Sequence, residues 1–111
     1  MSKSTNALQK RIKLALEAIK AAFGSEDDEF GTTLFVSHHL AELEESYWEE
    51  HLQTSAPAPS KVLDILVLSP RWTSDHGING IDFTLPGDVT NYIICVNFDE
   101  DGEVEDIAME S

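Results

Sequence analysis

Acidic side chains are the first candidates for chemistry in this sequence, and six of them fall within FDEDGEVED, residues 98–106. Carboxylates at this density can ligate calcium, attract a basic partner or solvate a turn. An EF-hand calcium loop needs oxygen ligands at positions 1, 3, 5 and 12 and a glycine at position 6. Counted from Asp99, Gly102 falls at position 4, and Glu110 falls at position 12 inside an expected strand. The spacing therefore argues against an EF-hand and leaves weak divalent binding, a basic partner and solvation open.

Histidines near acids are the second candidates, because they suggest a metal site. His38, His39 and His51 lie close to glutamates, and His38 is one helical turn from Glu42. A zinc site needs three or four converging ligands. Neighbouring residues on a helix point about 100° apart, so His38 and His39 do not easily serve one ion. We predict no metal site and no cofactor. The alternative is a small metal-binding protein or enzyme that uses His38, His39 and nearby acids.

Catalytic motifs are the third test. Serine, histidine and aspartate all occur, but the sequence contains no nucleophile elbow, phosphate loop or CxxC pair. With 21 acids in 111 residues, neighbours such as Glu44 and Glu45 arise by chance and are no evidence for acid–base catalysis. The sequence predicts a protein that is not an enzyme and has no catalytic residues.

The charge of the chain is strongly acidic and unevenly distributed. The formal net charge at pH 7 is -14, from 21 acids and 7 basic residues. Residues 1–20 hold five basic residues and one acid, a balance of +4, whereas residues 21–111 hold two basic residues and twenty acids, a balance of -18. Such a surface repels nucleic acid and anionic membranes, so neither is a predicted partner. The partner that the charge favours is a basic protein.

Exposed acids and one aromatic residue are the candidates for contact with that partner. The acids concentrate in residues 26–29, in an expected helix over residues 38–52 and in residues 99–106. Aromatic residues are enriched at binding hot spots, although a tryptophan in a small domain is more often a core residue. Solubility alone is the competing explanation for the acids. The predicted partner-binding residues are Asp99, Glu100, Asp101, Glu103, Glu44, Glu45, Trp48 and Glu49.

Two helices are expected in the first half of the chain. Apolar residues recur at helical spacing from Leu8 to Phe23, with Ser4 or Thr5 as the N-cap and Gly24 as the stop. The basic residues lie on the other face, which we interpret as solvated. The alternative is that this face pairs with acids of the chain or of a neighbouring subunit. After a short strand over residues 32–36, Ser37 is expected to cap the second helix, in which Leu40, Leu43, Tyr47 and His51 share one face.

The middle of the chain gives a weaker signal. Residues 53–60 are a surface connection of small residues and prolines, and residues 71–80 are an expected loop. KVLDILVL, residues 61–68, favours a helix capped by Ser60, but its apolar residues also suit a buried strand. Periodicity does not decide over so short a run.

The last third of the chain predicts an antiparallel sheet of GIDFTLP, YIICVNF and EVEDIAME. Apolar residues on both faces of YIICVNF indicate a central strand. Val104 and Ile107 are three apart, which a β-bulge near Glu105 or Asp106 would reconcile. DEDG is the expected turn between the last two strands. The side chains expected on one face of the central strand are Tyr92, Ile94, Val96 and Phe98, with Ile93 and Cys95 on the other.

These patterns predict a single α+β domain over residues 1–111, with two or three helices packed on a short antiparallel sheet of three or four strands. The single cysteine, Cys95, is expected in the core and fits a reducing compartment. Charged residues interrupt the apolar positions of the N-terminal helix, unlike a signal peptide, and VLDILVL is too short to cross a bilayer. A cytoplasmic location is therefore expected.

Two segments carry a resemblance to known proteins. HHLAELEESYWEEHL and IDFTLPGDVTNYIICVNFDEDGEVEDIAMES, less than half of the chain, resemble a family of small uncharacterised bacterial proteins that end in this hairpin. That family brings no established activity. The size and charge of the chain are also similar to those of immunity proteins, which protect a bacterium from its own or a sibling's secreted toxin. This second resemblance rests on charge and not on a motif, so it transfers no functional residue.

The favoured function is a non-enzymatic, acidic protein-binding domain. One form of it, which the second resemblance implies, is a bacterial immunity protein that neutralises a basic toxin such as a nuclease. Besides the metal-binding or enzymatic alternative, an acidic homodimeric structural subunit remains open. In that case the basic N-terminal helix would pack on an acidic neighbour. Both a monomer and a homodimer are compatible with the sequence.

Overall fold

The computed structural model of the protein describes residues 3–26, 31–70, 72 and 80–110, with residues 3–7 described by their backbone alone. Across these ranges, helices and a four-stranded antiparallel sheet form an α+β fold, which confirms the predicted class. None of the helices in these ranges combines the length and the apolar character needed to cross a membrane. The helices are α1 (Lys3–Ala22), α2 (Thr32–Glu42), α3 (Glu45–Leu52) and α4 (Pro59–Val62), and the strands are β1 (Val67–Leu68), β2 (Gly80–Thr84), β3 (Ile93–Phe98) and β4 (Val104–Glu110).

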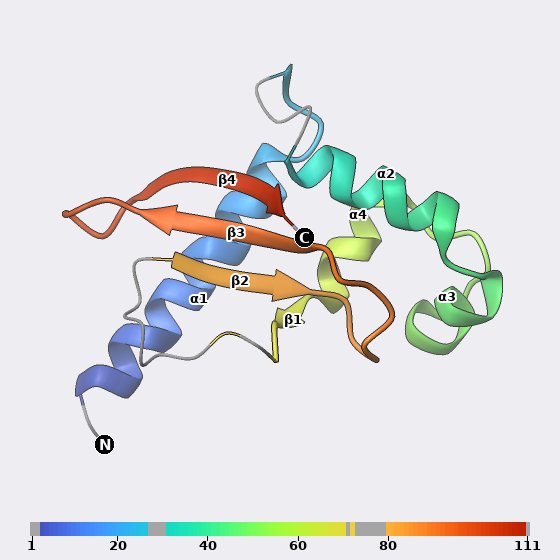
Figure 1. The fold of residues 1–111 in the computed structure, drawn as a ribbon, viewed down its shortest axis with the longest axis horizontal. Coiled ribbons are helices and arrows are strands. Elements are labelled where there is room, and N and C mark those ends of the chain that lie inside the picture. The colour runs from blue at the N-terminus through green and yellow to red at the C-terminus, as the bar shows by residue number, and fades with distance from the viewer. Residues whose placement is uncertain (1–2, 27–30, 71, 73–79, 111) are drawn as a thin grey trace.

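The sheet and the helices form two layers. The strands lie in the order β1-β2-β3-β4, and α1 crosses behind them (Figure 1). The helices α2 and α3 lie toward one end of the molecule, and the turn between β3 and β4 forms the other end (Figure 1). Ala15 and Ile19 of α1 are fully buried against the covered face of the sheet, where Ile94 and Val96 are also fully buried. Residues from all these helices and strands thus contribute to one hydrophobic core.

The expected strand over residues 32–36 is wrong, because this segment is the first half of α2. Thr32, Phe35, Val36 and His39 are buried at the spacing i, i+3, i+4 and i+7, which is one face of a helix. The β-branched residues of TTLFV favour a strand locally, but burial of this face against the sheet outweighs that preference. Ser37 therefore lies inside the helix, and its hydroxyl donates to the carbonyl oxygen of Leu34 instead of capping a helix.

The second expected helix, residues 38–52, is divided in two. Leu43 adopts an extended conformation and ends α2, and Glu44 precedes the first turn of α3. The break changes the direction of the chain, so that α3 does not continue the line of α2 (Figure 1). Gln53, in the left-handed conformation, ends α3. Neither proline nor glycine occurs at the break, so the sequence does not predict it.

The ambiguous segment over residues 61–68 contains both helix and strand. The helix α4 begins at Pro59, after Ala58 as the N-cap, so the expected cap at Ser60 is wrong. Proline suits the first helical position because its missing N–H would have no partner there. A short 3-10 turn, Leu63–Ile65, follows, and the chain then enters the two-residue strand β1. Of the expected loop over residues 71–80, residues 71 and 73–79 lie outside the described ranges, and Gly80 begins β2.

The C-terminal sheet follows the prediction closely. Strand β3 lies between β2 and β4, and its side chains alternate between buried and half-buried, with Ile94, Val96 and Phe98 on the buried face. The register shifts between Asn97, opposite Asp106, and Phe98, opposite Val104, which makes Glu105 the extra residue of a bulge. This confirms the predicted bulge. Cys95 is not a core residue, however: it is half-buried on the other face of the sheet, away from the core cluster.

Candidate functional site

The turn between β3 and β4 is organised by Asp99. Its Oδ1 accepts hydrogen bonds from the backbone N–H groups of Asp101 at 2.9 Å and of Glu103 at 3.1 Å. The backbone adds two more, from the N–H of Asp99 to the carbonyl of Glu103 at 2.8 Å and from the N–H of Gly102 to the carbonyl of Asp99 at 3.1 Å. Gly102 has a φ of +82°, which a side chain would strain. The turn is therefore fixed in shape by one of its own acids.

The remaining acids of this turn face solvent. Glu100, Asp101 and Glu103 are exposed, whereas Asp99 is half-buried. A hollow of about 460 Å³ lies at the tip and is lined by Phe98, Asp99, Glu100, Asp101 and Glu105. Glu105 was not among the predicted contact residues, although its position inside FDEDGEVED was the available signal. We call this surface, residues 99–103 together with Phe98 and Glu105, the acidic tip.

A basic residue of α1, Arg11, contacts the acidic tip. The guanidinium carbon of Arg11 lies 4.8 Å from the ring centroid of Phe98, a cation–π distance. A Cβ at Gly102 would lie 3.1 Å from Nη2 of Arg11, so this side chain also lies against the turn. Part of the basic face of α1 thus packs on an acidic part of the same chain.

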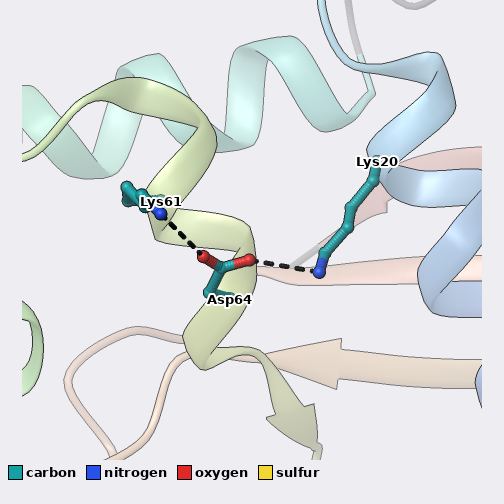
Figure 2. A network of polar contacts seen from close by, with 3 residues as sticks. All are labelled: Lys20, Lys61 and Asp64. Atoms are coloured by element: carbon teal, nitrogen blue, oxygen red, sulfur yellow. Dashed lines mark ion pairs between the residues drawn. The ribbon is translucent and has the colours of Figure 1, made fainter.

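A second basic residue of α1 also pairs internally. Nζ of Lys20 lies 3.1 Å from Oδ1 of Asp64, whose Oδ2 lies 3.8 Å from Nζ of Lys61 (Figure 2). All three side chains are about half exposed, so each pair adds little to stability. The pairs join α1 to the segment after α4, and they favour internal pairing over the interpretation of a wholly solvated basic face. Lys10 and Lys13 are exposed and fit the solvated interpretation.

The predicted contacts on α3 do not join the acidic tip. Glu44, Glu45 and Glu49 are exposed at the end of the molecule that carries α3, whereas the tip lies at the opposite end (Figure 1). The largest extent of the molecule is 40 Å, so one small contact patch does not cover both groups. We call Glu44, Glu45 and Glu49 the helix acids. The predicted contact residues therefore lie in two separate groups on the molecule.

Trp48 does not lie on the surface with them. Its side chain is only 2% exposed and belongs to the core, so its prediction as a contact residue is wrong. It packs edge-on against Tyr47 with ring centroids 5.0 Å apart. The Tyr47 hydroxyl donates to the carbonyl of Pro86 at 2.8 Å, and burial, followed by the charge of Glu50, raises the pKa of Tyr47 to about 12. The helix α3 thus carries acids on its surface and a packed pair of aromatic rings, Tyr47 and Trp48, on its inner side.

The histidines that the structure describes, His38, His39 and His51, are placed for packing. His39 is 1% exposed, and its Nδ1 lies 2.7 Å from the carbonyl oxygen of Phe35, so Nδ1 carries the proton and donates. Its Nε2 lies 2.9 Å from Oγ1 of Thr90 and accepts from that hydroxyl. Burial lowers the pKa of His39, and the hydrogen bond to Phe35 opposes this shift only in part, so the neutral ring is the favoured form at pH 7. Both ring nitrogens of His39 are engaged by protein atoms.

Of the histidines in the described ranges, His38 and His51 do not converge with His39 on one point. His38 packs edge-on against Tyr92 at 4.8 Å, and His51 lies against Tyr47 at 4.4 Å. Within the described ranges, no group of three or more histidine, cysteine, aspartate and glutamate side chains is placed to hold a metal ion. The described residues therefore supply no metal-binding geometry around His38 and His39.

Comparison with known proteins identified no relative of this chain. No family model matches the chain, no curated protein shows significant similarity to it, and no solved structure matches its fold. The resemblance of the two segments to a bacterial family accordingly stays a prediction.

Proposed function

We propose that this protein is a non-enzymatic binding domain that uses the acidic tip to contact a basic protein. One observation carries the proposal: Asp99 fixes the turn, so that Glu100, Asp101 and Glu103 are presented to solvent from a turn of defined shape. Binding to a turn of fixed shape costs less conformational entropy than binding to a turn that must first become ordered. The same charges repel nucleic acid and anionic membranes.

An immunity protein is the form of this function that we favour. The net charge of -14 attracts a basic toxin, such as a nuclease, over long distances at low ionic strength. Such a protein needs no catalytic residue, since it acts by covering its target. We place it in the cytoplasm, where a single unpaired cysteine such as Cys95 stays reduced.

The decisive experiment compares two variants of equal charge. In the tip-neutral variant, Glu100→Gln, Asp101→Asn and Glu103→Gln remove three acids from the turn. In the helix-neutral variant, Glu44→Gln, Glu45→Gln and Glu49→Gln remove three acids from the opposite end. Both keep Asp99 and therefore the hydrogen bonds that shape the turn.

Basic proteins captured from a lysate of the source organism at low salt are then quantified for each variant. We expect capture by the wild-type protein and the helix-neutral variant, and a loss of about tenfold or more for the tip-neutral variant. Raising the ionic strength should release the captured protein, because salt screens exposed charges. Equal loss in both variants would show that net charge attracts the protein without a local site, and absence of any captured basic protein would refute the proposal.

A further inference from the structure

The two edges of the sheet differ in a way that bears on binding. At one edge, β1 contains only the residues Val67 and Leu68, and Pro70 follows closely. At the other edge, β4 is the longest strand of the sheet, with seven residues and no proline. Short strands and prolines are common devices that protect an edge from pairing with another chain. The β4 edge lacks both.

The backbone of β4 is paired on one side only. Within the described ranges, β3 is the only strand that pairs with β4, which makes β4 an edge strand of the sheet. In an antiparallel pair, alternate residues direct their N–H and C=O groups away from the partner strand. The helices α1 and α2 contact β4, but neither pairs with it as a strand, so the sheet ends at β4 within the described ranges. The edge therefore presents backbone groups that another strand can pair with.

The side chains of β4 divide into two sets. Val104, Ile107 and Met109 lie opposite buried residues of β3 and are themselves only half-buried, which leaves apolar surface at the edge. Asp106 and Glu110 lie opposite Asn97 and Ile93, on the face of the sheet away from the core, and both are exposed. Apolar side chains thus line one side of the edge and acidic side chains the other.

This pattern selects the class of strand that fits. Side chains directly opposite each other on paired strands contact one another, and opposite charges there are favourable. An incoming strand with alternating apolar and basic residues would place its apolar side chains beside Ile107 and Met109. Its basic side chains would then lie beside Asp106 and Glu110. A second copy of β4 in the same place would bring acids near acids, which disfavours self-pairing.

We propose that the edge of β4 is a docking site for an extended segment of a basic protein, which adds to the sheet as a fifth strand. The inference rests on the proposed function, because it states how the basic partner binds. The two surfaces are continuous, since β4 begins at Val104, directly after the exposed Glu103 of the acidic tip. The tip attracts the partner by its charge, and β4 supplies main-chain hydrogen bonds.

The experiment uses a synthetic peptide as the probe. A peptide of alternating lysine and valine, equal in length to β4, is added to the full isotope-labelled protein at low salt, and amide exchange is followed by NMR. We expect the exchange of alternate β4 amides to slow by about tenfold or more on binding, because those amides gain a hydrogen-bond partner. A peptide of the same composition with lysines and valines in separate blocks keeps the charge, removes the alternation and should not protect β4.

Charge reversal on β4 supplies the second arm. Asp106→Lys with Glu110→Lys should weaken binding of the lysine–valine peptide by about tenfold and favour an alternating glutamate–valine peptide instead. The matched control, Glu44→Lys with Glu49→Lys, changes the net charge equally and should keep the original preference. Such an exchange of preference does not arise from a loss of folding.

Two results would overturn the inference. One is a lysine–valine peptide that binds without protecting any β4 amide, and the other is no binding by that peptide at concentrations of about 1 mM, near the weak end of measurable affinity. Neither result tests the role of the acidic tip, which the tip-neutral variant measures. If that variant alone loses the basic partner while β4 stays unprotected, the proposed function stands and the docking mode fails.

Discussion

The two acidic ends of the molecule are built in opposite ways. At the acidic tip, the carboxylate of Asp99 accepts two backbone hydrogen bonds and shapes the turn that presents the other acids. At the end formed by α2 and α3, Glu44 and Glu49 lie on the surface, while His39 and Tyr47 hold the interior by ring packing and hydrogen bonds. Acidic side chains therefore differ in role between the two ends. At the tip, one of them shapes the backbone, whereas at the other end they lie on the surface.

The largest expected effect is at the end held by ring packing. Replacing His39 by alanine removes a buried ring and leaves the hydroxyl of Thr90 without its acceptor. We expect the free energy of unfolding to fall by about 3 kcal/mol, as for other large buried side chains. Urea unfolding measures this. His38→Ala, on the same helix but half-buried, should cost about 1 kcal/mol. Equal losses in the two variants would show that the His39 network does not stabilise this end.

The acidic tip should be most sensitive at Asp99. In Asp99→Ala the N–H groups of Asp101 and Glu103 lose their acceptor, and we expect a loss of about 1.5 kcal/mol in the free energy of unfolding. Asp99→Asn keeps an acceptor oxygen and should restore most of that stability. At the opposite end, Glu49→Ala should change stability by no more than about 0.5 kcal/mol. A cost at Glu49 as large as that at Asp99 would contradict the contrast between the two ends.

A smaller effect at the tip isolates the contact with Arg11. Gly102 and Gly24 have similar positive φ angles, +82° and +85°, so alanine strains the backbone alike at both. No atom of the described residues lies within 4 Å of the Cβ position of Gly24, whereas that of Gly102 lies 3.1 Å from Nη2 of Arg11. We expect Gly24→Ala to cost about 1 kcal/mol and Gly102→Ala to cost more, by thermal unfolding. Equal costs would show that Arg11 moves aside freely.

The sequence predicted the tip better than the end that carries α2 and α3, and the reason is physical. Gly102, the alternation along β3 and the bulge at Glu105 follow from local rules of turns and pleated strands. The α2 segment depends on tertiary packing. Its buried face, from Thr32 to His39, does show helical spacing, but only when residues 32–36 are joined to residues 37–39.

Two features of the candidate site were beyond local rules. The break at Leu43 has no proline or glycine to mark it, and it decides which way the helix acids face. The distance between the acidic tip and the helix acids is set by the packing of α2 and α3 at one end of the sheet (Figure 1). Sequence alone gives the number of acids in each stretch, and only the fold shows that the two groups are separate.

Acidification should destabilise the end that contains His39. Burial lowers the pKa of its ring in the folded protein below the usual value of 6.5 in the unfolded chain, so the unfolded chain takes up the proton first. The stabilisation is complete above pH 6.5 and is lost as the pH falls below that value through the folded pKa. We therefore expect the melting temperature to fall as the pH is lowered below 6.5. In His39→Gln, which does not titrate there, the fall should be smaller.

The smallest effect tests whether the position of the charge matters. Raising the salt concentration from about 0.02 M to 0.3 M should raise the melting temperature by a few degrees, because it screens repulsion among the acids. The tip-neutral variant should respond less to salt than the helix-neutral variant. Its three acids are crowded on one turn, whereas Glu45 of the other group lies in the first turn of α3, where a negative charge is favourable. Equal responses would show that the total charge, and not its placement, governs the repulsion. The contrast between the two ends would then hold for structure alone.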